Sequence, residues 1–425
     1  MKIAIIGTGI AGNVVANRLA REHEITVFEA NGYVGGHTNT VDVEEGDRTF
    51  AVDTGFIVFN DRTYPNFIAL LEEIGQPARK SGMSFSVQNP AIGLEYNGSS
   101  LNGLFAQRRN LLKPRFIRMI RDILRFNEQA TELASETPDD RTIGDYLEEE
   151  GYSPAFRRDY LVPMMAAIWS AEPAQALDMP LGFLVRFFHN HGLLQLKDRP
   201  QWYTIEGGSR EYVKKLVAGH RDRIRLNAQV QSVSRMGDHV QVKAAGAPPE
   251  SFDHVFIACH SDQAMALLAD PTAAEREVLG AIPYQSNEAV LHTDVSLLPE
   301  RQRAWAAWNY HLPRGAHDLV SVTYNMNMLQ GLDARRQYSV TLNNTAAIDP
   351  SKVLYTVEYE HPVFNLDSVA AQARQKELNT GNMTSYCGAY WRNGFHEDGV
   401  FSAMEALRHF NEELQRAELH IRRAG

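Results

Sequence analysis

The chain has 425 residues, of which 44% are hydrophobic, a length that exceeds one ordinary domain and predicts two tandem or interleaved units. Its formal net charge of -10, from 52 acidic and 42 basic residues, argues against a protein that binds nucleic acid over its whole surface. Two cysteines cannot build a disulfide framework, and no signal-peptide pattern opens the chain. No run approaches the ~20 apolar residues that cross a bilayer. We therefore expect a cytoplasmic protein that at most attaches to the inner face of the membrane.

The first sixty residues predict a strand, a helix and a second strand in succession. Residues 2–6 are apolar and β-branched, as in a short buried strand that a glycine ends. Residues 11–21 have the apolar spacing of a helix, and residues 24–28 predict the second strand. This order is that of the unit that binds dinucleotides in Rossmann-type folds.

The loop before the helix has the G-x-G-x-x-G spacing of a dinucleotide-binding loop. Gly7 permits a tight turn, Gly9 lets the backbone approach a diphosphate, and Gly12 lets helix and strand pack closely. The start of the helix then directs free N–H groups at the phosphates. Glu29 ends the second strand, where a carboxylate accepts hydrogen bonds from both ribose hydroxyls. The cofactor ligands predicted here are Gly7, Gly9, Ile10, Ala11, Gly12, Glu29 and Ala30.

Paired glycines at positions 35 and 36 favour FAD over NAD as the dinucleotide. They resemble the E-x(n)-G-G-R/H stretch of glutathione-reductase-type flavoproteins, which continues the wrap of the protein around the FAD diphosphate. His37 stands where arginine is commoner, and its alternative role is that of a surface-loop histidine. The cofactor ligands predicted from this stretch and from residues 52–56 are Gly35, Gly36, His37, Thr54, Gly55 and Phe56.

Residues 104–126 carry seven basic residues and one acidic residue, which is unusual in an acidic chain. Pro114 is well placed to start a helix there, with arginines on one face and apolar side chains on another. Such a helix can lie against anionic lipid headgroups, so the segment bounded by Arg108 and Arg125 is a candidate for peripheral membrane contact. The alternatives are a solvated basic face of a substrate-domain helix and an acidic protein partner.

The segment that follows is rich in aromatic residues. Thr142 is predicted as the N-cap of a helix. Residues 160–169 and 183–188 supply material for a hydrophobic substrate tunnel or, as the default, for a domain core. His189 and His191 have no cysteine and no clear carboxylate partner, so no metal site is predicted.

The middle of the chain predicts a return to the dinucleotide-binding unit. A helical pattern follows the glycines at 207 and 208. Strands are predicted over residues 224–227, 230–233, 240–243 and 254–258, with a loop over residues 244–251. Val230 is expected where such folds contact adenine through backbone atoms. Cys259 follows the strand that passes near the dinucleotide, and its alternative role is that of a small buried residue.

The glycine- and aromatic-rich stretch from 388 to 399 is expected to meet the flavin ring. A helix predicted to begin near Val400 would direct the N–H groups around Asp398, Gly399 and Val400 at flavin N1 and O2, where negative charge develops on reduction. Tyr390 and Trp391 are expected to border the flavin ring or the substrate, or else to serve as ordinary core aromatics.

These stretches together resemble the flavin-containing amine oxidase superfamily, which includes monoamine oxidases, phytoene desaturases and protoporphyrinogen oxidase. Within it, the chain is similar to a bacterial branch of predicted NAD/FAD-binding, amine-oxidase-like proteins. The resemblance rests on residues 53–60, 83–87, 199–202, 207–213, 387–391 and 394–399. It implies an α/β fold, with a Rossmann-like FAD-binding domain of the glutathione-reductase type and an interleaved α+β substrate domain. The FAD-binding domain would comprise residues 1–60, 200–262 and 380–425, and the substrate domain residues 61–199 and 263–379.

No Ser-His-Asp, C-x-x-C or zinc pattern stands out in the sequence, so the chemistry is expected to belong to the flavin. The leading hypothesis is hydride transfer from a hydrophobic, acyl-lipid or isoprenoid-like substrate to flavin N5, in an oxidation or desaturation. The alternatives are amine oxidation, FAD-dependent double-bond isomerisation and a non-catalytic flavin-binding partner protein. Tyr390 and His396 are the catalytic candidates, Glu397 and Trp391 are further substrate contacts, and Lys197 is the lysine candidate for an amine oxidase. The sequence leaves the substrate, the electron acceptor and the oligomeric state open.

Overall fold

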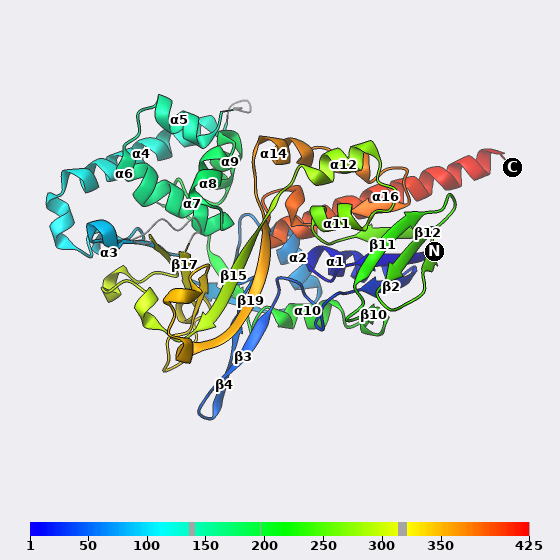
Figure 1. The fold of residues 1–425 in the computed structure, drawn as a ribbon, viewed down its shortest axis with the longest axis horizontal. Coiled ribbons are helices and arrows are strands. Elements are labelled where there is room, and N and C mark those ends of the chain that lie inside the picture. The colour runs from blue at the N-terminus through cyan, green and yellow to red at the C-terminus, as the bar shows by residue number, and fades with distance from the viewer. Residues whose placement is uncertain (136–140, 196, 313–320, 425) are drawn as a thin grey trace.

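The computed structural model describes residues 1–135, 141–195, 197–312 and 321–424. Figure 1 shows two lobes on either side of a long pair of strands, β15 (Tyr284–His292) and β19 (Val353–Pro362). The lobe with both termini contains a parallel sheet, and helices dominate the far end of the other lobe. The fold is therefore mixed α/β, as the sequence predicted.

The parallel sheet has five strands in the order β10-β2-β1-β14-β20. Their bounds are Lys2–Ile6 for β1, Glu24–Phe28 for β2, Ile224–Arg225 for β10, His254–Ile257 for β14 and Thr384–Tyr386 for β20. The sheet thus joins three segments that lie far apart in the sequence. The strands predicted over residues 2–6 and 24–28 are confirmed.

The two faces of this sheet pack against different layers. Ile3 and Ile5 face one core and Ala4 and Ile6 the other, because successive side chains of a strand alternate. The first core contains α1 (Ile10–Leu19), α2 (Pro65–Glu73), α10 (Arg210–Leu216) and α16 (His396–Ala424). The second core contains β11 (Val230–Arg235), β12 (Val240–Ala244), β13 (Glu250–Phe252) and α12 (Ala273–Gly280). Residues 250 and 251, predicted in a loop, lie in β13, and α1 ends two residues before its predicted end.

The second lobe is built on a seven-stranded sheet in the order β19-β15-β18-β17-β16-β7-β8. Its neighbouring strands are antiparallel apart from the parallel pair β16 and β7. The remaining bounds are Phe85–Asn89 for β7, Leu94–Asn97 for β8, Trp308–His311 for β16, Ser321–Asn325 for β17 and Ser339–Leu342 for β18.

Helices form the outer end of this lobe. They are α3 (Leu101–Leu104), α4 (Pro114–Leu133), α5 (Ile143–Glu149), α6 (Pro154–Phe156), α7 (Val162–Trp169), α8 (Pro173–Asp178) and α9 (Leu181–Asn190). As predicted, α4 starts at Pro114 and Thr142 caps α5, where its Oγ1 accepts the N–H of Asp145 at 3.1 Å. The aromatic side chains of residues 160–169 and 183–188 pack mostly into one core, which favours a packing role over a tunnel. Within the described residues, no helix is long and apolar enough to cross a membrane.

Smaller elements complete the fold. They are the hairpin β3 (Thr40–Glu45) and β4 (Arg48–Asp53), the small sheet β5 (Phe59–Asn60), β9 (Trp202–Ile205) and β6 (Ala78–Ser81), and the helices α11 (Ser261–Leu267), α13 (Met326–Leu329), α14 (Leu366–Gln372) and α15 (Gln375–Leu378). Side chains from residues 264–282 and 371–378 join the second core of the parallel sheet. We therefore propose that the FAD-binding unit includes these two segments in addition to residues 1–60, 200–262 and 380–425.

Candidate functional site

Glycines shape the loop between β1 and α1. Gly7 has a φ of +101°, a backbone angle that residues with a side chain rarely adopt. Its N–H donates to the Phe28 carbonyl at 2.8 Å. A Cβ on Gly12 would collide with the Gly7 carbonyl oxygen, so glycine is required there. A Cβ on Gly9 would meet no atom within 4 Å. The backbone at Gly9 therefore borders open space, as a loop that cradles a diphosphate requires.

The buried carboxylate of Glu29, at the end of β2, turns toward this loop. Its Oε2 accepts the backbone N–H of Thr8 at 3.0 Å and also the Thr8 hydroxyl, and its Oε1 accepts the N–H of Asn31 at 2.8 Å. A carboxylate has about four acceptor positions, so this geometry leaves one for a ribose hydroxyl instead of the two expected. The Glu29 carbonyl accepts the N–H of Ala228 at 2.8 Å, which brings the strand that begins at Val230 beside the same site.

The paired glycines return the chain to the loop. Both have positive φ, and a Cβ on Gly36 would lie 3.1 Å from the Cα of Gly9. The His37 carbonyl accepts the N–H of Phe56 at 2.9 Å, and a Cβ on Gly55 would collide with that carbonyl. The three glycine-containing stretches predicted to bind FAD in the first sixty residues therefore lie against one another.

A cluster of histidines lies beside this junction. The His37 ring stacks on Tyr359 with centroids 4.8 Å apart, and lies 5.5 Å from the His361 ring and 5.9 Å from the His260 ring. Its Nε2 is buried and has no hydrogen-bond partner among the described residues. Burial, followed by the neighbouring histidines, holds the pKa of His37 well below its usual value, and burial lowers the pKa of His361 to about 4. His37 is half-buried and its ring packs among other rings, which disfavours the surface-loop role, and its lowered pKa disfavours a fixed positive charge.

His396 is buried in the first turn of α16. Its Nε2 lies 3.0 Å from both Thr38 Oγ1 and Tyr212 OH, and its ring stacks on Phe56 with centroids 3.5 Å apart. Burial lowers its pKa to about 3, so the ring is neutral and acts as a hydrogen-bond partner. Neither Thr38 nor Tyr212 was predicted as a site residue. Only the position of Thr38 directly after the Gly-Gly-His motif could have indicated it.

Helix α16 begins at His396, four residues earlier than predicted. The Asp398 carboxylate accepts the N–H of Phe395 at 2.9 Å and so caps the helix from its third position. The N–H groups of Asp398 and Gly399 donate to the Phe395 carbonyl at 3.0 and 3.1 Å. These two amides, which were predicted to point at flavin N1 and O2, therefore already have an acceptor within the protein. The early start was missed because the N-cap residue, a phenylalanine, has no capping side chain.

The start of α16 packs against the start of α1. A Cβ on Gly399 would lie 2.6 Å from Ile10 Cγ2 and 3.8 Å from Ala11 N, and Val400 is buried in the same core. The C-terminal stretch predicted to meet the flavin therefore borders the helix predicted to meet the diphosphate.

Two other candidate site residues, Glu397 and Tyr390, contact other parts of the protein. The Glu397 carboxylate accepts the N–H of Phe67 at 2.9 Å and so caps α2. Tyr390 packs on Trp391 with centroids 5.1 Å apart in the second core of the parallel sheet, and its hydroxyl has no partner among the described residues. Because His396 packs against Phe67 in the first core instead, the structure does not bring the two catalytic candidates together.

The remaining predicted residues differ in exposure. Val230 is buried, Cys259 is half-buried, and Ala30 and Lys197 are exposed. Burial raises the pKa of the Cys259 thiol to about 12, so it carries no negative charge at neutral pH. In the part of the chain that the structure describes, no group of three or more His, Cys, Asp or Glu side chains is arranged to hold a metal ion.

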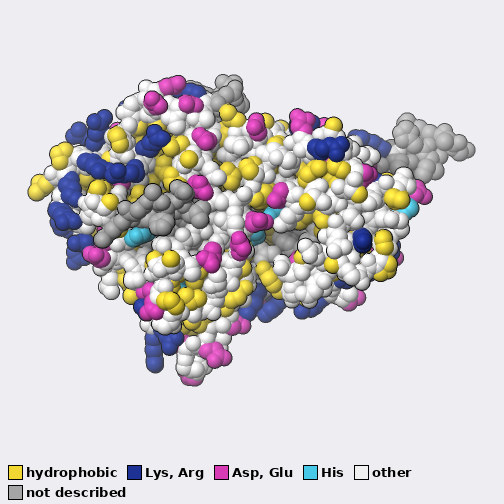
Figure 2. Space-filling view, viewed as in Figure 1, with side chains coloured by type: hydrophobic (Ala, Val, Ile, Leu, Met, Phe, Trp, Pro, Cys, Tyr) yellow, Lys and Arg dark blue, Asp and Glu magenta, His cyan; other side chains and the backbone are white. Residues whose placement is uncertain are grey.

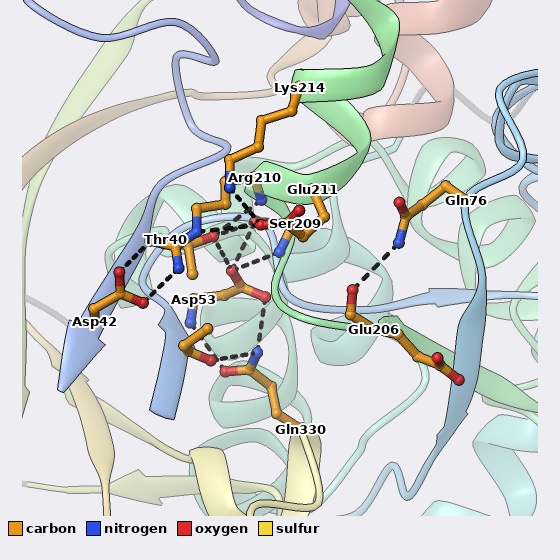
Figure 3. Close-up of polar contacts among 11 residues, drawn as sticks. Thr40, Asp42, Asp53, Gln76, Glu206, Ser209, Arg210, Glu211, Lys214 and Gln330 are labelled. Atoms are coloured by element: carbon orange, nitrogen blue, oxygen red, sulfur yellow. Dashed lines mark hydrogen bonds and ion pairs between the residues drawn. The ribbon is translucent and has the colours of Figure 1, made fainter. Parts of the chain in front are cut away.

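Figure 3 shows a buried carboxylate, Asp53, at the junction of the lobes. It accepts hydrogen bonds from the Thr40 hydroxyl at 2.6 Å, from the N–H and hydroxyl of Ser209 at 2.8 and 2.7 Å, and from Gln330 Nε2 at 2.9 Å. Burial raises its pKa to about 6. Since Thr54 follows it directly, Asp53 holds the backbone next to the predicted cofactor ligands Thr54, Gly55 and Phe56. The sequence carried no signal for this role.

A family model for flavin containing amine oxidoreductases matches residues 10–326. The chain belongs to this family. The family uses FAD, so the predicted cofactor is confirmed together with the family resemblance. Two observations fit a bound FAD. A Cβ on Gly9 would meet no atom within 4 Å, and the buried Nε2 of His37 has no hydrogen-bond partner among the described residues.

Two curated relatives have named activities. The flavoprotein is 27% identical to "Putative flavin-containing monoamine oxidase AofH" of Mycobacterium tuberculosis over 281 residues, which are 63% of this chain and 59% of that protein. It is 52% identical to 4,4'-diapophytoene desaturase of Staphylococcus aureus over 40 residues, which are 9% of this chain and 8% of the desaturase. The flavoprotein therefore spans less than two thirds of the length of either relative.

Solved structures cover nearly the whole flavoprotein. Cyclohexylamine oxidase from Brevibacterium oxydans IH-35A has a TM-score of 0.70 at 16% identity, covering 97% of this chain and 99% of the oxidase. The CLA-producing fatty acid isomerase from P. acnes has a TM-score of 0.66 at 14% identity, covering 96% and 98%. At these identities, the likeness shows a shared fold.

Proposed function

We propose that this flavoprotein is an FAD-dependent oxidoreductase that takes hydride from a hydrophobic substrate. The proposal rests on the bare loop at Gly9, against which the other predicted cofactor stretches converge. When bound, FAD supplies the hydride acceptor. The chain's own residues bind the cofactor, orient the substrate and exclude water.

The proposed cofactor ligands are those predicted from the sequence. Amides at the start of α1 would hold the diphosphate, and Glu29 would hold the ribose. The amides of Asp398 and Gly399 are already bonded within the protein. The start of α16 would therefore favour negative charge on the flavin through the helix dipole instead of through direct hydrogen bonds from these two amides. Val230 and Cys259 would border the adenine and the diphosphate.

The substrate we propose is an acyl-lipid or isoprenoid-like molecule, which is oxidised or desaturated. The titratable rings nearest the junction, His37, His361 and His396, are held neutral by burial. None of these three rings therefore carries a charge that could pair with a charged substrate, and charge is costly to bury unpaired. Tyr390 and His396 remain the proposed catalytic residues. The ring of His396 would be held in place by its hydrogen bonds to Thr38 and Tyr212.

Amine oxidation is the second candidate, since a monoamine oxidase relative and a cyclohexylamine oxidase structure carry that activity in their names. Amine oxidases often have a lysine near the flavin, whereas Lys197 is exposed. Double-bond isomerisation is a variant of the first proposal that the isomerase structure supports. A non-catalytic partner protein would bind FAD that no small molecule reduces.

The test is an anaerobic absorbance titration of the purified, FAD-loaded chain. Unsaturated and branched acyl lipids, isoprenoids and primary amines are added separately. Bleaching by lipids alone supports the proposal, and bleaching by amines alone supports the second candidate. A product with a shifted double bond and no lasting bleaching indicates the isomerase, and no response to any compound indicates a partner protein.

We further propose that the protein works on the cytoplasmic side of a membrane, where it contacts anionic lipid through the segment bounded by Arg108 and Arg125. Free thiols at both cysteines are compatible with a reducing compartment. No feature of the described surface indicates nucleic acid as a partner.

A further inference from the structure

Three exposed leucines mark the end of the helical lobe. Leu112 is 87% exposed, Leu101 77% and Leu111 51%, and the first two are the most exposed large hydrophobic side chains among the described residues. Leu111 and Leu112 end the 3-10 helix Arg108–Leu112, directly before α4. We call Leu101, Leu111 and Leu112 the leucine tip. Figure 1 shows that α3 and α4 lie at the opposite end of the molecule from the parallel sheet.

Five cations surround the leucine tip without an acidic partner. Among the described residues, no ion pair is formed by Lys113, Arg118 or Arg121. Arg108 and Arg109 donate to neutral oxygens, Asn102 Oδ1 at 2.6 Å and the Gly93 carbonyl at 2.9 Å. We call the five the basic collar: Arg108, Arg109, Lys113, Arg118 and Arg121. Figure 2 shows basic side chains gathered with hydrophobic ones at this end of the molecule.

Two other arginines of the same segment are engaged within the protein. Arg115 forms an ion pair with the buried Asp159 at 2.5 Å, and Arg125 donates to the Glu150 carbonyl and lies over the Tyr152 ring. The basic face predicted from the sequence is therefore divided. One part stabilises the lobe, and the basic collar is left for an external anion.

We propose that the leucine tip inserts into the interfacial layer of a bilayer that contains anionic phospholipid, while the basic collar binds the headgroup phosphates. A solvated face explains the arginines but not the high exposure of Leu101, Leu111 and Leu112 on the two short helices that precede α4. The combination of apolar side chains and a cationic rim matches an interfacial membrane anchor. A shallow groove there has apolar side chains beside two cations and one carboxylate, and the carboxylate already accepts the N–H of Ser153; its lining is Leu111, Leu112, Pro114, Ile117, Arg118, Arg121 and Asp122. This inference deepens the membrane contact proposed above, and it does not depend on the flavin chemistry.

The test is co-sedimentation of the full chain with vesicles of phosphatidylcholine, with or without about 30% phosphatidylglycerol, at low salt. Binding is expected only with phosphatidylglycerol, and added salt should weaken it by screening. Arg118→Glu with Arg121→Glu should lower the partition coefficient at least about a hundredfold, since two attractions become repulsions. Leu111→Ser with Leu112→Ser should lower it at least about tenfold at unchanged charge.

Matched controls separate the tip from general effects of charge and hydrophobicity. Arg221→Glu with Lys243→Glu makes the same charge change at exposed positions in the parallel-sheet lobe, and Leu354→Ser with Leu366→Ser removes two other exposed leucines. Both should bind vesicles like the wild type. FAD content and the anaerobic titration should be unchanged in all variants, so a failed membrane contact is distinguishable from a failed enzymatic proposal.

Three outcomes would overturn the inference. The first is no binding to anionic vesicles. The second is loss of binding in the arginine variant with full binding in the leucine variant, which would mean a purely electrostatic surface suited to an acidic protein. The third is self-association of the free chain that the leucine variant abolishes, which would make the tip an interface between two copies.

Discussion

At the scale of single residues, one carboxylate should decide whether the cofactor is held. Glu29→Ala removes the acceptor that faces the predicted ribose, so we expect FAD affinity to fall about 10- to 100-fold, the loss typical of a charged hydrogen bond. Titration of the apoprotein with FAD, followed by flavin fluorescence, measures it. Glu29→Gln keeps the shape and a neutral acceptor and should bind with intermediate affinity. Undiminished FAD occupancy in Glu29→Ala would show that the ribose ligand is another group.

His396 leads to a prediction about pH. Its pKa is about 3 in the folded protein and 6.5 in an unperturbed chain, so between these values only the unfolded chain binds the proton. The stability that the neutral ring contributes is complete above pH 6.5 and declines as the pH falls toward 3. His396→Asn should therefore reduce the slope of unfolding free energy against pH by up to about 1.4 kcal/mol per pH unit between about pH 4 and 6. Urea unfolding at several pH values measures the slope, and parallel curves for the two proteins would contradict it.

The glycine loop and Glu29 could be predicted because their geometry depends on neighbours within thirty residues. The partners that complete the site could not. His361 reaches His37 only because β19 pairs with β15, and Gln330 reaches Asp53 across 277 positions. Such contacts arise from packing of the second lobe, and no local pattern encodes them.

At the scale of elements, the start of α16 differed from its predicted position, and it also joins distant segments. Glu397, in the first turn of α16, caps α2. Glu397→Ala should lower the free energy of unfolding by about 1–3 kcal/mol, because buried N–H groups lose their acceptor. Glu412→Ala, on the same helix, removes a half-exposed carboxylate that lies near Arg408, His409 and Arg416. Such ion pairs contribute little, so this variant should cost under about 1 kcal/mol. Denaturant unfolding compares them. Slower flavin reduction at unchanged stability would instead make Glu397 a substrate contact.

At the scale of the whole molecule, Asp53 connects the hairpin, the Gly-Gly-Ser turn and the second lobe. Asp53→Asn leaves one acceptor oxygen for donors that now use two, so we expect unfolding free energy to fall by about 2–3 kcal/mol and FAD affinity to fall with it. Asp42→Asn is the matched control in the same view (Figure 3), since its pair with Arg210 lies on the surface and should contribute little. Thermal unfolding with and without FAD tests both. Equal melting temperatures for the two variants would show that the junction does not depend on this carboxylate.

The strand order of the parallel sheet has a consequence during synthesis. β14 pairs with β20, so a nascent chain on the ribosome carries β1, β2, β10 and β14 with one apolar edge unpaired until residues 384–386 emerge. Helix α16, which borders the predicted cofactor loop, is translated later still. Newly made protein should therefore acquire its flavin only after these later segments have emerged, and should depend on chaperones to shield that edge until then.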